Sequence, residues 1–233
     1  MPQLYTYIIP VDDGAAPNPY GGICTLNICK PAIRRTASVD DWVAAFGSKS
    51  RGQAGRLVYA MRISDKMRMS DYDRHTLQHL SKKVPDVGSP KIENRLGDSI
   101  YDFSADPPIQ RLGVHDASNH HTDLSGAFCL LSNHFVYFGR NTIEVPQELR
   151  VVIYQGRGHR RGRNDPFVSD FVRWIEPIIA AGDQIRGDPD YEIDWGRGCT
   201  SGCGVVADED RFGEEEGEPD EQPVRAPTCN TPC

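Results

Sequence analysis

The first two-thirds of the chain contain more segments with a β-strand pattern than with a helical one, and turn residues separate these segments. The sequence LYTYII at residues 4–9 is aromatic and β-branched and ends at a proline, as a strand would. Residues 41–48 and 55–64 are two further strand candidates, and the Gly, Ser, Lys and Arg residues between them predict a hairpin. Residues 128–139 predict one long strand, or two short strands that bend at the Ser-Asn pair in the middle.

One helix is well indicated in the last third of the chain. Apolar residues recur at helical spacing over residues 168–179, after a possible N-cap at Asn164 or Asp165. Pro177 is expected to kink or shorten this helix. A weaker amphipathic pattern predicts a second helix over residues 70–80, capped by its first residue, a serine.

Closely spaced strands with few helices favour an α+β fold. We expect a bent mixed sheet or a small β-barrel, with helical insertions and a C-terminal helix. Residues 81–122 have little periodicity and many turn residues. They predict an irregular excursion of the kind that often carries function.

The chain of 233 residues is long enough for one hydrophobic core with a small appendage. Residues 205–233 hold nine acidic residues and two arginines, which equals the whole formal net charge of −7. A segment rich in Glu, Pro and Gly buries too little apolar surface to offset its ordering entropy. We therefore expect one domain over residues 1–204, followed by an acidic disordered tail over residues 205–233.

Hydropathy and cysteine usage indicate a cytoplasmic protein. No stretch approaches the roughly 18 apolar residues of a membrane span, and the first residues lack a basic, apolar leader. The seven cysteines are an odd number at irregular spacing, so we expect reduced thiols. Neither Cys24 with Cys29 nor Cys199 with Cys203 has the C-x-x-C spacing of a zinc knuckle or a redox pair. We therefore expect no metal site and no cofactor.

Two basic segments stand out in a domain whose charges balance overall. Residues 30–68 contain nine basic and three acidic residues, and residues 150–163 contain five arginines and no acid. Such segments are typical of a surface that binds a polyanion, and nearby glycines let backbone N–H groups approach a phosphate. The alternative is a pair of ordinary solvated loops.

Several motifs together resemble one family. The segment APNPYGGICTLNICKPAIRR at residues 16–35 is followed by GRLVYAMRI, then by LLSNHFVYFGR and finally by GRGH. This succession, which covers most of residues 4–179, resembles the nucleotide modification associated domain 2 family. The strands within residues 41–64 are also similar to the hairpin of PUA-like domains. Asp40 stands where the family has a glycine, and Asn133 stands where it has an aspartate, so residue 133 offers no catalytic acid.

The resemblance implies association with phage or bacterial systems that install or handle modified bases in DNA. It implies no particular reaction and no catalytic residue. Two functions therefore stay open: a domain that binds DNA or a nucleotide and recognises a modified base, and an enzyme that acts on a nucleotide or DNA base. The expected partners are DNA or a nucleotide that contains a modified base, and other proteins of a modification complex, but no membrane.

For the binding function, the candidates are residues that can hold a phosphate or a base edge. Arginine offers a bidentate fork and lysine a point charge, although either can also be part of a solvated face. Asn18, between two prolines, can read a base or cap a turn. A reader of bases also needs an aromatic platform, for which Tyr20, Trp42, Tyr59 and Tyr137 are candidates. The nucleotide-binding candidates are Asn18, Thr25, Lys30, Arg34, Arg35, Ser48, Tyr137, Arg157 and Arg161.

For an enzyme, the candidates are a cysteine or histidine that acts as nucleophile or base. Cys24 and Cys29 lie near Lys30, and a nearby cation favours the thiolate, but cysteines are also among the most buried residues. His134 lies beside the predicted bend. His159 lies among arginines that disfavour its charged form, so it could act as a base. We expect Cys24 with His134 or His159 to be the catalytic residues of such an enzyme.

Other chemistries lack their motifs. The chain has neither the glycine-rich loop of a P-loop or Rossmann fold nor the signature of a zinc deaminase. His120, His121 and Asp123 are possible metal ligands, but adjacent histidines on a loop are common without a metal.

The two basic segments are expected to share one pocket. The loop with Lys30 and Arg35 and the GRGH loop with Arg157 and His159 should form its opposite walls, because a phosphate or base needs donors from more than one element. Pairing of the N-terminal strand with the strand at residues 128–139 would bring these loops together.

Overall fold

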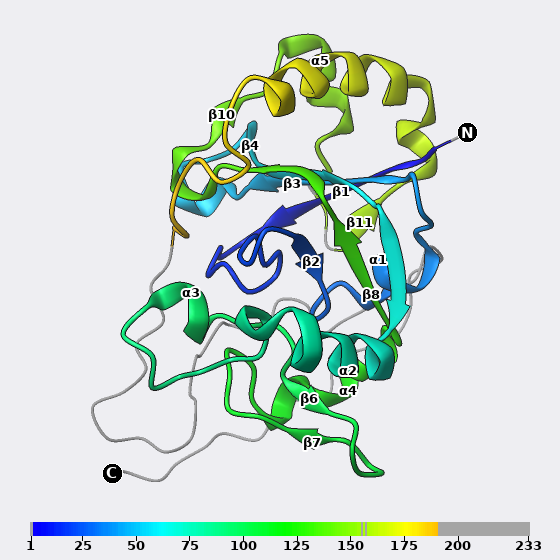
Figure 1. The fold of residues 1–233 in the computed structure, drawn as a ribbon. Helices are drawn as coiled ribbons and strands as arrows, with labels where there is room; N and C mark the ends of the chain where they lie inside the picture. Colours follow the sequence, from blue (N-terminus) through cyan, green and yellow to red (C-terminus); the bar gives the residue numbers. More distant parts are fainter. Residues whose placement is uncertain (1, 155, 157, 191–233) are drawn as a thin grey trace, which may run out of the picture.

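The computed structural model describes residues 2–154, 156 and 158–190. Its centre is a mixed sheet of six strands in the order β10-β4-β3-β1-β11, with β9 also paired to β4 (Figure 1). β1 runs parallel to β3, and the other pairs are antiparallel. The strands are β1 (Leu4–Ile9), β3 (Trp42–Gly47), β4 (Arg56–Arg62), β9 (His134–Tyr137), β10 (Ile143–Glu144) and β11 (His159–Arg160).

The predicted α+β fold is confirmed, and of its two alternatives the mixed sheet is the one that forms. The sheet is not closed into a barrel. β1 has the predicted bounds, and β3 and β4 form the predicted hairpin. The predicted bend is also confirmed, because the chain leaves β8 (Phe128–Ser132), passes Asn133 and enters β9 in a different sheet.

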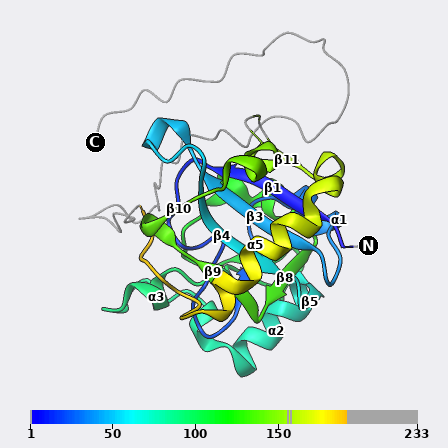
Figure 2. The same ribbon diagram turned by 90° about the horizontal axis from the view of Figure 1, so that it is seen from above.

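Both faces of the large sheet are buried, because its central strands are apolar at almost every position. In β3, Val43 belongs to the core on one face and Trp42 to the core on the other. The first face packs against β2 (Cys24–Leu26) and α1 (Pro31–Thr36). Helix α5 (Val168–Ala180) covers the second face, and Figure 2 shows it lying across the strands.

Helix α5 begins later than predicted. Its expected N-cap, Asn164 or Asp165, lies in the preceding 3-10 segment η6 (Gly162–Phe167). Asn164 is instead buried, and its amide donates to the Leu4 carbonyl at 2.9 Å, so it ties η6 to β1. Pro177 lies inside the helix without ending it.

Helix α2 (Met69–His79) begins just before its predicted cap, Ser70, and has no side-chain cap. The chain enters the helix directly from strand β5 (Asp65–Arg68), and the N–H of Met69 donates to the carbonyl of Ala127 at 3.0 Å. A backbone acceptor from another part of the chain therefore takes the place of the serine cap.

The second sheet has three strands in the order β2-β8-β5, on the side of the large sheet opposite α5 (Figure 1). Beside it lies the predicted excursion of residues 81–122, which is confirmed as a succession of short elements. These are η2 (Ser81–Lys83), α3 (Ile92–Arg95), β6 (Tyr101–Asp102), β7 (Ile109–Gln110), η3 (Ala117–Asn119) and the start of α4 (His120–Ser125). The remaining 3-10 segments are η1 (Lys49–Arg51), η4 (Gly139–Asn141) and η5 (Gln147–Val152).

Within the described part of the chain, no helix combines the length and the apolar character that crossing a bilayer requires. The predicted tail at residues 205–233 and the cysteines Cys199, Cys203, Cys229 and Cys233 lie outside the described residues. The domain boundary at residue 204 therefore stays a prediction.

Candidate functional site

Cys29 lies at a sharp turn between β2 and α1. It and Lys30 have positive φ angles of 57° and 41°, a left-handed conformation that costs about 1–2 kcal/mol per residue outside glycine. Two hydrogen bonds hold the turn. The N–H of Cys29 donates to Asp123 Oδ1 at 2.8 Å, and Arg34 Nε donates to the carbonyl of Cys29 at 2.7 Å. The surrounding structure therefore fixes a strained backbone at a residue that carries a thiol.

His115 is held in the excursion by the residues around it. Asp116 caps η3, because its Oδ1 accepts from the N–H of Ser118 at 2.8 Å, and the Asn119 side chain accepts from the N–H of Asp116 at 3.2 Å. Gln110 Nε2 donates to the carbonyl of His115 at 2.9 Å. The imidazole therefore extends from a fixed backbone position.

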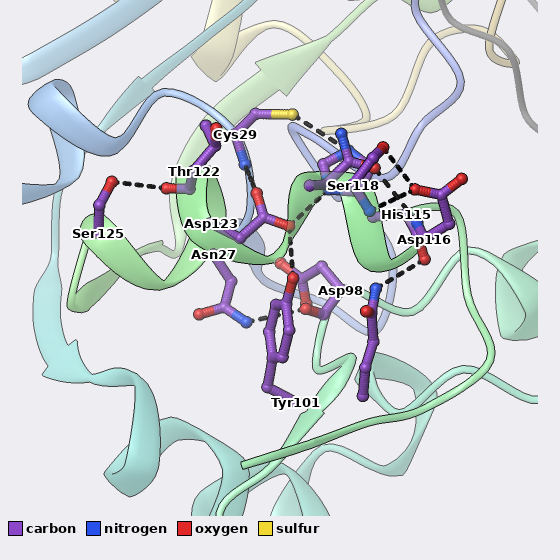
Figure 3. A network of polar contacts seen from close by, with 12 residues as sticks. Asn27, Cys29, Asp98, Tyr101, His115, Asp116, Ser118, Thr122, Asp123 and Ser125 are labelled. Atoms are coloured by element: carbon purple, nitrogen blue, oxygen red, sulfur yellow. Dashed lines mark hydrogen bonds and ion pairs between the residues drawn. The ribbon is translucent and has the colours of Figure 1, made fainter. Parts of the chain in front are cut away.

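These two elements and α4 bring a thiol, an imidazole and a carboxylate into one chain of contacts (Figure 3). Cys29 Sγ lies 3.4 Å from His115 Nε2, and His115 Nδ1 lies 2.6 Å from Asp123 Oδ2. Each ring nitrogen therefore has one partner. A nucleophile, a base and a group that orients the base stand in hydrogen-bond contact in that order.

Asp123 is itself anchored from two sides. Tyr101 donates its hydroxyl proton to Asp123 Oδ2 at 2.9 Å. Arg34 is fully buried in α1, and its guanidinium donates to the backbone carbonyls of Asp123 and Phe128 at 2.5 and 3.0 Å. Arg34, a nucleotide-binding candidate, thus connects the Cys29 turn to helix α4 inside the protein.

The charges of the three residues support one another. Burial alone would lower the pKa of His115, but the negative charge of Cys29 and the hydrogen bonds to Asp123 and Cys29 raise it well above its ordinary value. Burial alone would raise the pKa of Asp123, but the hydrogen bond and charge of His115, the N–H of Cys29 and the charge of Arg34 lower it. The surroundings of His115 therefore favour its protonated form.

The residues of this chain of contacts are buried to different degrees. The side chain of Asp123 is 1% exposed and that of His115 is 14% exposed, and Cys29 is half-buried. Cys24 and Cys129 are completely buried, and burial raises the pKa of Cys24 to about 12. Of the three described cysteines, Cys29 alone has both solvent access and a histidine partner.

Two nucleotide-binding candidates, Asn18 and Thr25, belong to a buried network around Lys83. Lys83 Nζ donates to Asn18 Oδ1 at 2.7 Å and to Thr25 Oγ1 at 3.0 Å, and the Thr25 hydroxyl donates to Asp98 at 2.6 Å. Asn18 Oδ1 also accepts from the N–H of Tyr20 at 3.1 Å, as expected if it caps a turn. This network stabilises the loop that leads to Cys29.

His134 and Tyr137 project from opposite faces of β9, as their spacing predicts. The hydroxyl of buried Tyr137 donates to Asp12 at 2.7 Å, whereas His134 Nε2 contacts Glu176 at 2.8 Å and its ring packs against Trp42. Cys24 lies in the core on the Tyr137 side. The structure therefore does not bring Cys24 and His134 together. A further candidate, Ser48, is buried beside Ser50 in the β3–β4 hairpin.

Lys30 and His159 both lie against aromatic residues of β1. Tyr7 pairs with His159 in the register of β1 and β11, so their side chains share one face of the sheet. The Nζ atom of Lys30 lies 5.0 Å from the centre of the Tyr7 ring, and the His159 ring stacks on Tyr5 at 5.9 Å. A cation and an imidazole therefore lie beside the same strand, and the cation belongs to the residue that follows Cys29 in sequence.

The strand pairing that was predicted to bring the two loops together was wrong. β1 does not pair with residues 128–139, because β3 and β11 occupy its two edges. β11 begins at His159, the last residue of GRGH, so this histidine pairs with β1 directly. Arg35 lies at the end of α1, where it donates to the carbonyl of Ser125 at 3.0 Å, and Arg161 lies just before η6. Arg157 lies outside the described residues.

Cys29, His115 and Asp123 also form a group that could hold a metal, since their ligand atoms lie within 4.8 Å of one another. The contacts are less suited to chelation than to proton transfer, because Cys29 and Asp123 engage opposite nitrogens of the His115 ring. Of the possible ligands named from sequence, Asp123 belongs to this group, and His120 and His121 do not.

Sequence reasoning named Cys29 as one of two candidate thiols but missed both of its partners. His115 lies in a segment without periodicity, and Asp123 was considered only as a metal ligand. A capping pattern at Asp116 and Asn119 is the one local signal that His115 precedes an ordered turn.

Comparison with known proteins identifies one family. No curated protein and no solved structure matches the chain significantly. The family described as nucleotide modification associated domain 2 matches residues 1–196, which is most of the sequence and includes Cys29, His115 and Asp123. The chain therefore belongs to the nucleotide modification associated domain 2 family, whose name links it to systems that modify nucleotides.

Proposed function

We propose that this domain is an enzyme of a nucleotide modification system, with Cys29 as nucleophile, His115 as its base and Asp123 as the group that orients His115. The observation that carries the proposal is the unbroken sequence of contacts from Sγ to Nε2 and from Nδ1 to the carboxylate, at 3.4 and 2.6 Å. A nucleophile within reach of a base that a third group orients is the general requirement for covalent catalysis by a thiol.

Each residue has a distinct part in the reaction. His115 Nε2 takes the proton of the Cys29 thiol, which leaves a thiolate as the attacking group. Asp123 accepts a hydrogen bond from Nδ1–H, so that the ring keeps its orientation and its positive charge is balanced. Because the carboxylate is also bonded to Tyr101 and to the N–H of Cys29, it holds both the base and the backbone of the nucleophile.

The basic groups near the turn fit the nucleotide end of such a substrate. Lys30 follows Cys29 in sequence, and His159 lies across the strand pair from Tyr7, over which Lys30 is placed. A phosphate that contacts these groups would leave the rest of the nucleotide close to the thiol. Lys30 and His159 are therefore the residues that we assign to substrate binding.

A purely binding function has less support. Of the four aromatic residues suggested as a stacking platform, Trp42, Tyr59 and Tyr137 are in the core, with at most 2% exposure. Only Tyr20 among these four is half-buried. A reader of bases would need aromatic faces that a base can reach.

The proposal is tested by the reactivity of each cysteine in the full chain. Iodoacetamide labelling, resolved by peptide mass spectrometry, should modify Cys29 much faster than Cys24 and Cys129. His115→Gln should slow labelling of Cys29 by about tenfold or more at neutral pH, because the thiol loses the group that takes its proton. His121→Gln, an exposed histidine in the same region, is the matched control and should leave the rate unchanged. Labelling of Cys29 that is equally fast in His115→Gln and wild type would contradict the proposal.

A further inference from the structure

We infer that the thiol of Cys29 attacks an acyl carbon, so that the substrate is an ester, thioester or amide whose acyl group is joined to, or transferred onto, a nucleotide. This inference rests on the proposed function and specifies its substrate class. The alternative target of a thiol in nucleotide chemistry is a ring carbon of a pyrimidine base.

The position of the proton donor distinguishes the two targets. His115 Nε2 lies beside Cys29 Sγ, at 3.4 Å. A proton on this nitrogen can reach an atom that is bonded directly to the attacked carbon. Acyl transfer needs a proton at that place, because the departing amine or alcohol is attached to the carbonyl carbon itself.

Addition to a pyrimidine ring has a different requirement. No group leaves in the addition step, and the negative charge moves to the exocyclic oxygen or the neighbouring ring atoms. The general acid for this reaction must then lie at the edge of the base where the negative charge develops, away from the attacked carbon. The described contacts of His115 instead direct its two nitrogens to Cys29 and Asp123.

The acyl reaction needs only water or an amine as a second reactant. In the first half, the thiolate forms a C–S bond, the bond from the acyl carbon to the amine, alcohol or thiol breaks, and His115 gives its proton to the departing group. In the second half, water or an amine attacks the thioester, His115 Nε2 takes the proton of the incoming group, and the thiolate of Cys29 leaves. Nothing is oxidised or reduced, and the enzyme returns to its starting state.

The backbone of the turn limits how the tetrahedral intermediate can be stabilised. The N–H of Cys29 already donates to Asp123 Oδ1, at 2.8 Å. The oxyanion must therefore take its hydrogen bonds from groups other than this N–H. The same bond keeps Sγ in place while the acyl carbon is attacked, since Asp123 holds both ends of the contact between thiol and imidazole.

The test uses the full chain and two chemically defined probes. p-Nitrophenyl acetate reports acyl transfer, through release of p-nitrophenol and through mass spectrometry of the acetylated peptide. A single-stranded oligonucleotide that contains 5-fluoro-2′-deoxycytidine reports attack on a pyrimidine ring, through a covalent protein–DNA adduct. Wild type, Cys29→Ser, Cys29→Ala, His115→Gln and the control His121→Gln are compared, with thermal melting to verify that each is folded.

We expect acetyl transfer to Cys29, removal of the acetyl group by hydroxylamine, and repeated turnover in wild type and His121→Gln. Both cysteine variants should lose the reaction, and His115→Gln should slow turnover by about a hundredfold. An adduct with the fluorinated oligonucleotide, or rapid iodoacetamide labelling of Cys29 without acetyl turnover, would overturn the acyl inference while leaving the nucleophile in place. Slow iodoacetamide labelling of Cys29 would instead contradict the proposed function itself, because Cys29 would then not be an activated nucleophile.

Discussion

The backbone N–H of Cys29 and the carboxylate of Asp123, 94 positions apart in the chain, are joined by a hydrogen bond of 2.8 Å. The other oxygen of the same carboxylate contacts His115. One buried side chain therefore fixes the strained turn that carries the thiol and also the base beside it. A change at Asp123 should alter stability and reactivity together.

Replacement of Asp123 by Asn provides the first prediction. The lowered pKa of the carboxyl means that it stabilises the fold fully above its ordinary pKa of about 3.9, and that this contribution is lost as the pH falls through the lower folded-state pKa. Asp123→Asn should therefore lower the free energy of unfolding at pH 7, by about 1–3 kcal/mol. The deficit should shrink in strong acid. Urea unfolding at pH 7 and near pH 3 measures both values.

The same variant should change the reactivity of Cys29. His115 would lose a partner that raises its pKa, so its proton would be held less tightly. Labelling of Cys29 by iodoacetamide at neutral pH should then be slower than in wild type, and its rise with pH should move to a higher range, because a weaker base takes the thiol proton less readily. Tyr101→Phe, which removes a single hydrogen bond to the carboxylate, should shift the profile less. An unchanged pH profile in Asp123→Asn would show that Asp123 does not act through His115.

Arg34 and Arg35 provide a matched pair for the second prediction. Arg34 is fully buried and donates to three carbonyls, whereas Arg35 is exposed. Arg34→Met should destabilise the protein by about 3–5 kcal/mol, because buried acceptors and the Asp123 charge lose their partner. Arg35→Met should change stability by less than about 0.5 kcal/mol. Chemical denaturation of both variants measures the difference, and equal losses would contradict the structural assignment of Arg34.

Local patterns predicted β1, β3, β4, β8 and β9, but not the other described strands. The bounds of β1, the β3–β4 hairpin and the break at Asn133 all follow from side-chain alternation and turn residues within a few positions of one another. The pairing partners of β1 could not be obtained in this way. They depend on a parallel connection to β3 through β2 and α1, which no local pattern specifies.

Local patterns predicted even less of the candidate site. The contact between Cys29 and His115 spans 86 positions, and His115 lies in an excursion that has no periodicity to place it. Arg34 was predicted to bind a nucleotide, with a solvated basic face as the alternative, whereas the structure buries its side chain against three backbone carbonyls. Composition cannot reveal such acceptors, because they are backbone atoms of distant segments.

The third prediction concerns Gly126, which lies against Arg34. A Cβ atom at residue 126 would stand 2.2 Å from Arg34 Cζ, and the hydrogen bonds of the guanidinium prevent it from moving aside. Gly126→Ala should therefore cost about 1–3 kcal/mol and slow labelling of Cys29, whose carbonyl also accepts from Arg34. Gly162→Ala is the control, since nothing lies within 4 Å of the added atom. Melting temperatures that fall equally in both variants would refute the steric explanation.

The last prediction concerns Asp12, which accepts a hydrogen bond from Tyr137 at 2.7 Å and is 5% exposed. Burial raises its pKa to about 7, although the hydrogen bond from Tyr137 opposes the shift. The folded protein therefore binds this proton more tightly than the unfolded chain does. The contribution of Asp12 to stability is full below its ordinary pKa and declines as the pH rises towards 7. Asp12→Asn cannot ionise, so the variant should gain stability relative to wild type between pH 5 and pH 8. Paired urea titrations at these two pH values measure the change, and a difference between wild type and variant that stays constant would show that the carboxyl ionises as easily in the fold as in water.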